Sequence, residues 1–250
     1  MHGIGVVVNV VTIVIGTAIG LAFGGVIPAQ LRETAFKGIG LSTVVIGAAM
    51  SIGGLTDLGR SHIGQYAPLV LVAALVVGSI IGEAVRIEYW LERFGIWLRS
   101  VAHRVTWLAP PPHEDDRKGH TLVEGFVTAS LLFCVGAMTI LGSIQDGLGN
   151  PSTLYLKATL DGFASIALAS TLGIGVGLSV IPVIVIQGAI AVGASFMTPI
   201  MTPAVIAGIR CGGGALILAI GLDITGIKRL PVGNMLPAII VAAVLGGLFG

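Results

Sequence analysis

Apolar residues run in long, nearly uninterrupted stretches along this chain, separated by short polar segments. A helix that crosses the hydrocarbon core of a bilayer needs about 20 mostly apolar residues. Eight ranges approach that length: 4–24, 38–55, 67–87, 122–144, 154–176, 180–198, 211–226 and 232–249. The pattern therefore predicts an all-α, polytopic bundle of about eight transmembrane helices.

The fifth and sixth spans form one continuous apolar run, so their separation depends on local punctuation. Glycine and proline interrupt helices, and the run contains a Gly-Val-Gly-Leu-Ser segment at 175–179 with Pro182 just beyond. We place the break there. Merging the two stretches gives seven spans, which is the alternative arrangement.

Composition agrees with a membrane environment and excludes several partners. The 250 residues are 55% hydrophobic and only 10% charged, whereas soluble domains carry about 25% charged residues. The formal net charge is +1, so no basic surface for a nucleic acid is expected. We expect a single integral membrane domain over residues 1–250, with the lipid bilayer as its main partner.

Basic residues are distributed unevenly between alternate loops of the eight-span arrangement. Ten of the 13 Lys and Arg residues fall on one side, and cytoplasmic loops carry the excess of such residues. We therefore expect that side to be cytoplasmic and both termini to lie outside.

The long segment 85–120 between spans three and four is the largest part of the cytoplasmic side. Its first part carries Trp90, Trp97 and Trp107 among arginines at helical spacing, which predicts an amphipathic helix lying on the membrane surface. A partner-binding helix is the alternative. The prolines at 110–112 and the charges after them predict a stiff, charged linker.

Three pairs of short strings indicate internal repeats. The first two relate spans two and three to spans seven and eight, and the third relates span four to span five. In the eight-span topology, the two members of each pair cross the membrane in opposite directions to each other, which is the pattern of inverted-repeat transporters. The pairs are 40–47 with 214–221, 64–78 with 233–247, and 124–136 with 161–173.

Asp161 is the best candidate for a functional residue, because a carboxylate inside a span is costly and needs a reason. If the fifth span starts directly after Ser152, Asp161 lies nine residues in, and Ser165 adds a hydroxyl one turn further on. Carboxylate and hydroxyl oxygens suit a hard cation or a proton relay. A structural alternative is an ion pair with Lys157, which is placed at i,i+4 and can extend toward the headgroups.

Four more polar residues complete the candidate solute or ion pathway. Glu124 and Thr128 match Asp161 and Ser165 in the third repeat, although Glu124 also completes a capping box at the start of span four. Asn9 lies in span one and Gln187 in span six. The alternative for each of these two is a hydrogen bond that bridges helices.

The chain lacks the motifs of the common enzymes and cofactor sites. It has no phosphate-binding Gly-Lys-Ser loop, no Gly-x-Ser-x-Gly elbow and no His-Glu-x-x-His pair. Cys134 and Cys211 both lie in apolar runs without ligand-like neighbours. We expect no catalytic residues, no cofactor and no metal.

Long strings of this sequence resemble a family of bacterial and archaeal multi-pass membrane proteins, domain of unknown function 554. They are EGFVTASLLFCVGAM from Glu124, LDGFASIALASTLGIGV from Leu160, the opening stretch 5–24 with Asn9, and NMLPA from Asn234. The resemblance covers essentially the whole chain. It implies a protein of the prokaryotic cytoplasmic membrane, of a kind often described as transporters, and it implies no particular substrate.

Together these observations predict a secondary transporter of a small polar solute or ion in the plasma membrane of a prokaryote. A channel is the first alternative, and a membrane scaffold or regulator without transport is the second. The sequence leaves the substrate, the coupling ion and a homo-oligomeric state open.

Overall fold

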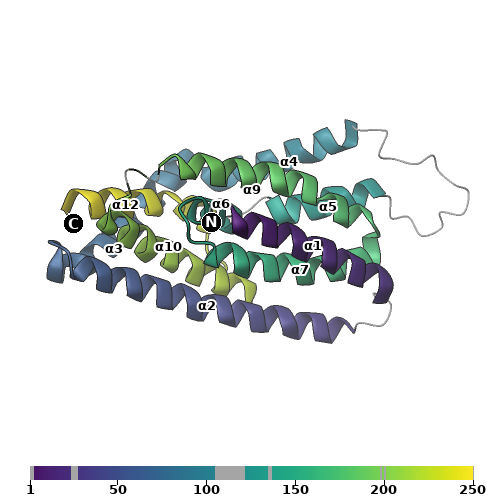
Figure 1. The fold of residues 1–250 in the computed structure, drawn as a ribbon, viewed down its shortest axis with the longest axis horizontal. Coiled ribbons are helices and arrows are strands. Elements are labelled where there is room, and N and C mark those ends of the chain that lie inside the picture. Colours follow the sequence, from purple (N-terminus) through teal and green to yellow (C-terminus); the bar gives the residue numbers. More distant parts are fainter. Residues whose placement is uncertain are drawn as a thin grey trace, which may run out of the picture. The chain divides into compact units, whose positions relative to one another are not determined.

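The computed structural model describes residues 3–23, 28–104, 122–134, 137–197, 199 and 201–249. Throughout these ranges the regular structure is helical and contains no strand, which confirms the all-α prediction (Figure 1). The helices are α1 (Ile4–Phe23), α2 (Ala29–Gly59), η1 (Gly64–Tyr66), α3 (Ala67–Val85), α4 (Ile87–Arg104), α5 (Leu122–Cys134), α6 (Ala137–Gly147), α7 (Ser152–Leu172), α8 (Gly175–Leu178), α9 (Val180–Ser195), α10 (Pro203–Ile224), α11 (Val232–Met235) and α12 (Pro237–Phe249).

Six helical stretches in the described part are long and apolar enough to cross a membrane. A seventh span results if the bent pair α5 and α6 counts as one. The remaining predicted span is the fifth, which corresponds to α7; this helix is 21 residues long but carries Lys157, Asp161 and several hydroxyl groups. The count of eight therefore stays a prediction that depends on this polar helix.

The chain divides into two compact units, each built from segments far apart in the sequence. Unit 1 comprises Met1–Thr34 and Leu91–Ser195, and unit 2 comprises Ala35–Trp90 and Phe196–Gly250. Whether the two act as one integral membrane domain stays a prediction. Each unit is described separately below.

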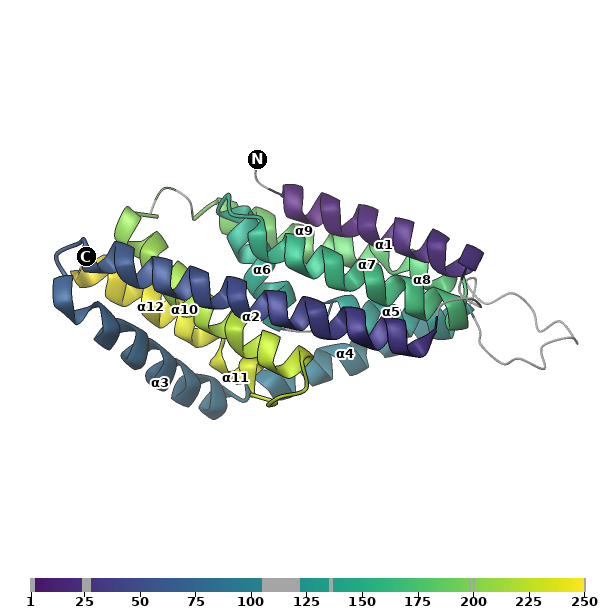
Figure 2. The ribbon, with the colours of Figure 1, turned by 90° about the horizontal axis from the view of Figure 1, so that it is seen from below.

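Glycines bring α1 and α7 together in unit 1. A Cβ atom at Gly16 would collide with the carbonyl oxygen of Gly162, and one at Gly20 would collide with that of Ile166. Contacts advance along both helices in the same direction, so α1 and α7 are parallel and lie side by side (Figures 1 and 2). Small residues allow this approach of two backbones, as in other membrane helix pairs.

The fourth predicted span is a broken helix in unit 1. The axis turns by 62° between Gly125–Cys134 and Met138–Gly147. The Thr139 hydroxyl donates a hydrogen bond of 3.0 Å to the Phe133 carbonyl, which satisfies one of the acceptors left free at a helix end. A break of this kind is tolerated in a membrane only where protein or a polar cavity surrounds it.

The predicted break between the fifth and sixth spans is present, but it begins earlier than expected. Helix α7 ends at Leu172, and Gly173 follows with a φ of 72°, a conformation that glycine adopts readily. The segment at 175–178, which we expected to interrupt the run, instead forms the short helix α8.

In unit 2, α2 and α10 are antiparallel and contact each other through glycines in a reciprocal register. A Cβ atom at Gly47 would meet the backbone of Gly214 and Leu218, while one at Gly214 would meet Gly47 and Ser51. Each glycine thus faces the other and the residue four positions beyond it. A local two-fold relation equates Gly47 with Gly214, whereas the first predicted repeat pair equates Gly47 with Gly221, so the two registers differ by seven residues.

Helices α3 and α12 form a second antiparallel pair in unit 2 (Figure 2). Gly78 contacts Ala238, and Gly82 contacts Asn234. The inverted repeat stays a prediction, and these two antiparallel pairs are the arrangement that it requires.

The predicted amphipathic helix is α4, with Trp90 and Ile96 exposed. Arg86, in the left-handed conformation, separates it from α3. The charged linker after Arg104 lies outside the described residues.

Candidate functional site

Helix α7 carries a column of buried polar side chains along one face. Thr153, Lys157, Asp161 and Ser165 follow one another at intervals of four residues, and all four are buried. Residues four apart lie one above the other on a helix, so the column is continuous. It makes α7 less apolar than α1, α3, α9, α10 and α12.

Lys157 and Asp161 form an ion pair at the centre of this column. The Lys157 Nζ lies 2.8 Å from Asp161 Oδ1 and 2.6 Å from Oδ2. Their side chains are only 6% and 7% exposed. The pair that sequence analysis treated as a structural alternative therefore exists, but Lys157 is enclosed by protein rather than extended toward the headgroups.

The Phe133 ring, in the last turn of α5, has its centre 6.0 Å from Lys157 Nζ. An ammonium within about 6 Å of a ring centre is attracted to it. The end of the first half of the broken helix thus lies next to the ion pair.

Two amide side chains join α1 and α9 to the ion pair. Asn9 Nδ2 donates hydrogen bonds to Asp161 Oδ2 at 3.0 Å and to Gln187 Oε1 at 3.2 Å. Both amides are fully buried. We call Asn9, Lys157, Asp161 and Gln187 the polar cluster.

Two polar atoms of this cluster have no protein partner. They are Asn9 Oδ1, an acceptor, and Gln187 Nε2, a donor. Buried polar groups without a hydrogen bond are costly and uncommon. The cluster therefore offers both an acceptor and a donor that the protein leaves unused.

A second group of polar residues, which sequence analysis did not identify, lies at the end of α6. Asp146 is fully buried and accepts hydrogen bonds from the backbone N–H groups of Gly5 at 3.0 Å and Val6 at 3.2 Å. A carboxylate is stabilised at a helix N-terminus, here that of α1. The neighbouring Gln145 accepts a hydrogen bond from Thr153, the first residue of the polar column.

The six candidates from the sequence separate into those inside and those outside the cluster. Asn9, Asp161 and Gln187 are in direct contact. Ser165 is fully buried, but its hydroxyl donates to the backbone carbonyl of Asp161 at 2.7 Å and not to the carboxylate. Thr128 is exposed and does not face the bundle interior as the third repeat predicted. The side chain of Glu124 lies outside the described part of the chain.

The described residues contain no group of three or more His, Cys, Asp or Glu side chains able to hold a metal ion. Cys134 and Cys211 are buried and not paired in a disulfide. The polar cluster is therefore the candidate site among the described residues.

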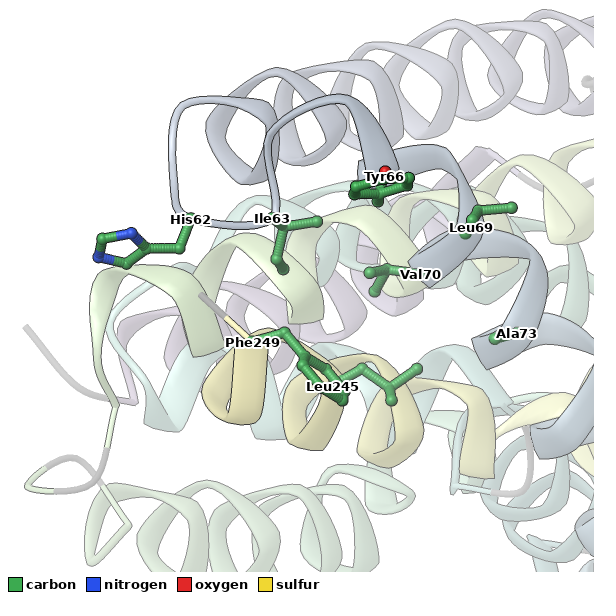
Figure 3. Close-up of a pocket in the computed structure, with 8 residues that line it drawn as sticks. All are labelled: His62, Ile63, Tyr66, Leu69, Val70, Ala73, Leu245 and Phe249. Carbon is green, nitrogen blue, oxygen red and sulfur yellow. The ribbon is translucent and has the colours of Figure 1, made fainter.

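Unit 2 has a different character. One of its pockets, of about 410 Å³, lies between the start of α3 and the end of α12, with apolar side chains such as Leu69, Val70 and Leu245 around it (Figure 3). Its main ion pair joins Arg210 of α10 to Asp57 of α2 at 2.5 Å, with both side chains 39% exposed. Neither feature forms an enclosed polar site.

Comparison with known proteins gives relatives over nearly the full length. The chain is 30% identical over 241 residues to "Uncharacterized protein YqgA" of Escherichia coli strain K12, which covers 96% of this chain and 94% of the relative. It is 29% identical over 242 residues to "Uncharacterized membrane protein YdfK" of Bacillus subtilis strain 168, with the same coverage of both chains. No solved structure matches.

The family model described as "Protein of unknown function (DUF554)" matches residues 4–246. These residues include every helix that contributes to the polar cluster. The chain belongs to the DUF554 family of proteins.

Proposed function

We propose that this membrane protein is a secondary transporter of a small polar solute or ion, and that the polar cluster is its binding site. The observation that carries the proposal is the buried Lys157–Asp161 pair, together with the unused polar atoms of Asn9 and Gln187. Ionisable residues within membrane helices are rare and mark substrate or ion pathways.

The broken helix supports the same proposal. Transporters commonly bind their substrates where a membrane helix is interrupted, and the α5–α6 break lies beside Phe133, which contacts Lys157. The antiparallel helix pairs of unit 2 support alternating access, since inverted repeats are common among such proteins. The relatives in Escherichia coli and Bacillus subtilis favour a prokaryotic plasma membrane as its location.

A metabolite-resolved uptake screen in proteoliposomes tests the proposal. The wild-type protein should accumulate at least one solute with saturation, and Asp161→Asn should abolish its coupled transport while the protein stays inserted and monodisperse. A flux that neither saturates nor responds to a counter-gradient would instead indicate a channel. If no solute moves, the transporter proposal is wrong and a scaffold or regulator remains.

A further inference from the structure

We propose that the polar cluster takes up a small monovalent anion, such as a monocarboxylate or nitrate, together with one proton. This inference rests on the proposed transport function and names its substrate class and its coupling ion. The charge balance of the buried groups supports it.

The cluster is electrically neutral, with one ammonium and one carboxylate. Helices α1, α5, α6 and α8 pack against α7, and α9 packs against α1, α5 and α6. Among their described side chains, the other titratable groups are Cys134 on α5 and Asp146 on α6, and Tyr155 lies on α7 itself. Asp146 binds the start of α1 through two backbone N–H groups. No further described charge on these helices is therefore available to balance a bound ion.

A net charge buried away from water is costly unless it is paired. An anion alone would make the cluster −1, and a proton alone would make it +1. An anion and a proton together keep the cluster neutral. The cluster is then neutral both before and after binding, so no net charge has to be carried through the low-dielectric interior of the bundle.

A cation fits the cluster less well. Lys157 already contacts both oxygens of the Asp161 carboxylate, and Asn9 Nδ2 occupies one of them as well. A metal cation would have to displace this ammonium and would leave two positive charges opposite one carboxylate. Hard cations also require several oxygen ligands at once, whereas the nearest unused groups are one amide oxygen and one amide N–H group.

The unused polar atoms match the protonated state of the cluster. The proton comes from a hydronium ion of the entering solution: an O–H bond of that ion breaks, an O–H bond forms on Asp161, water is left behind, and the hydrogen bonds to Lys157 are lost. A protonated carboxyl group donates one hydrogen bond, and Asn9 Oδ1 is an acceptor without a partner. The released Lys157 ammonium and Gln187 Nε2 then provide donors for the anion. When the anion leaves, the same proton leaves Asp161 and the ion pair forms again.

Proton uptake into proteoliposomes with a trapped pH-sensitive dye tests the inference. Inward gradients of nitrate, L-lactate and glycolate serve as anion probes, and gradients of Na⁺ and choline serve as cation probes. Nitrate matters because its acid is strong, so neutral acid does not carry protons through the lipid. We expect saturable acidification of the interior with at least one anion probe and no response to either cation.

Binding experiments on the purified protein separate the roles of the two charged residues. Lys157→Met should weaken binding of the active anion by at least about thirtyfold, because the anion loses its buried counter-charge. Asp161→Asn resembles the protonated state of the cluster, so this variant should still bind the anion. The bound anion should raise its thermal stability, but binding should not be accompanied by proton uptake. Asp57→Asn, in the half-exposed ion pair of unit 2, is the matched control and should behave like the wild type.

Infrared difference spectra of the wild-type protein give a readout that needs no variant to fold. The active anion should produce the C=O band of a protonated carboxyl group, and Asp161→Asn should remove that band. If the anion binds and produces this C=O band but is not transported, the anion site is supported and the transporter proposal is contradicted. Flux of a solute without proton movement, proton movement driven by a cation, or no response to any anion probe would overturn the inference.

Discussion

Each unit has a short ion pair among its described residues, and these two pairs differ in burial more than in geometry. Lys157 and Asp161 are 2.6 Å apart and almost completely enclosed. Arg210 and Asp57 are 2.5 Å apart, but more than a third of each side chain is exposed. Exposed pairs contribute about 0 to 1 kcal/mol, whereas breaking a buried pair costs about 3 to 5 kcal/mol. Short distances alone therefore do not identify a functional pair.

The first test of this comparison is whether both pairs belong to the same side of the membrane. In the eight-span prediction, Lys157 and Arg210 belong to the outer side, and the C-terminus lies outside as well. A C-terminal alkaline phosphatase fusion should therefore be active, and a fluorescent fusion that requires the cytoplasm should be dark. The reverse pattern would mean an odd number of spans, with α7 as the helix that does not cross.

Asp161→Asn should have the largest effect on stability. It leaves the Lys157 ammonium buried without its counter-charge, so the free energy of unfolding should fall by about 3 to 5 kcal/mol. Thermal unfolding in detergent measures the change.

The double variant Lys157→Met with Asp161→Asn removes both charges and should recover most of this stability. Transport should stay lost in the double variant. Full transport activity there would make the pair purely structural.

Gly47→Ala and Gly214→Ala test the helix contact that supports unit 2. Each added methyl group would collide with the facing backbone, and overpacking costs about 1 to 3 kcal/mol. Because the contacts are reciprocal, the two losses should be nearly equal. Gly38→Ala, on the same helix as Gly47 with nothing within 4 Å, is the control and should be neutral or slightly stabilising. Strongly unequal losses would argue against a local two-fold axis.

Arg210→Gln should have the smallest effect. Asp57 keeps Arg60 at 3.7 Å, and water reaches the group, so the free energy of unfolding should change by at most about 1 kcal/mol. Transport measured beside the wild type should be unaltered. A loss comparable to that of Asp161→Asn would remove the distinction between the two pairs.

The sequence identified the centre of the cluster because polar residues stand out in apolar helices. Asn9, Asp161 and Gln187 each interrupt a long apolar stretch, and the structure brings all three into contact. Asp146 and Gln145 were missed for the opposite reason. They end an apolar run, where polar residues are expected to meet water, and the packing of α9, α7 and α1 against α6 buries them.

The repeat in the sequence was a poorer guide to side-chain position. Thr128 corresponds to Ser165 in the third repeat, yet Thr128 is exposed while Ser165 is buried. Similarity between two short sequence segments determines neither how a helix is rotated about its axis nor which elements pack against it. Lys157 shows the same limit, because its spacing predicted a partner but not its burial.

The contact between Asp146 and α1 has a consequence for how the protein is made. The carboxylate that binds the first turn of α1 lies 140 residues further along the chain from Val6. During synthesis, α1 enters the membrane first, and its leading N–H groups lack this acceptor until α6 has been translated. The first turn of α1 therefore acquires this acceptor only long after α1 itself has been translated. Chains stopped before residue 146 should expose their N-terminus to protease more readily than chains stopped shortly after it.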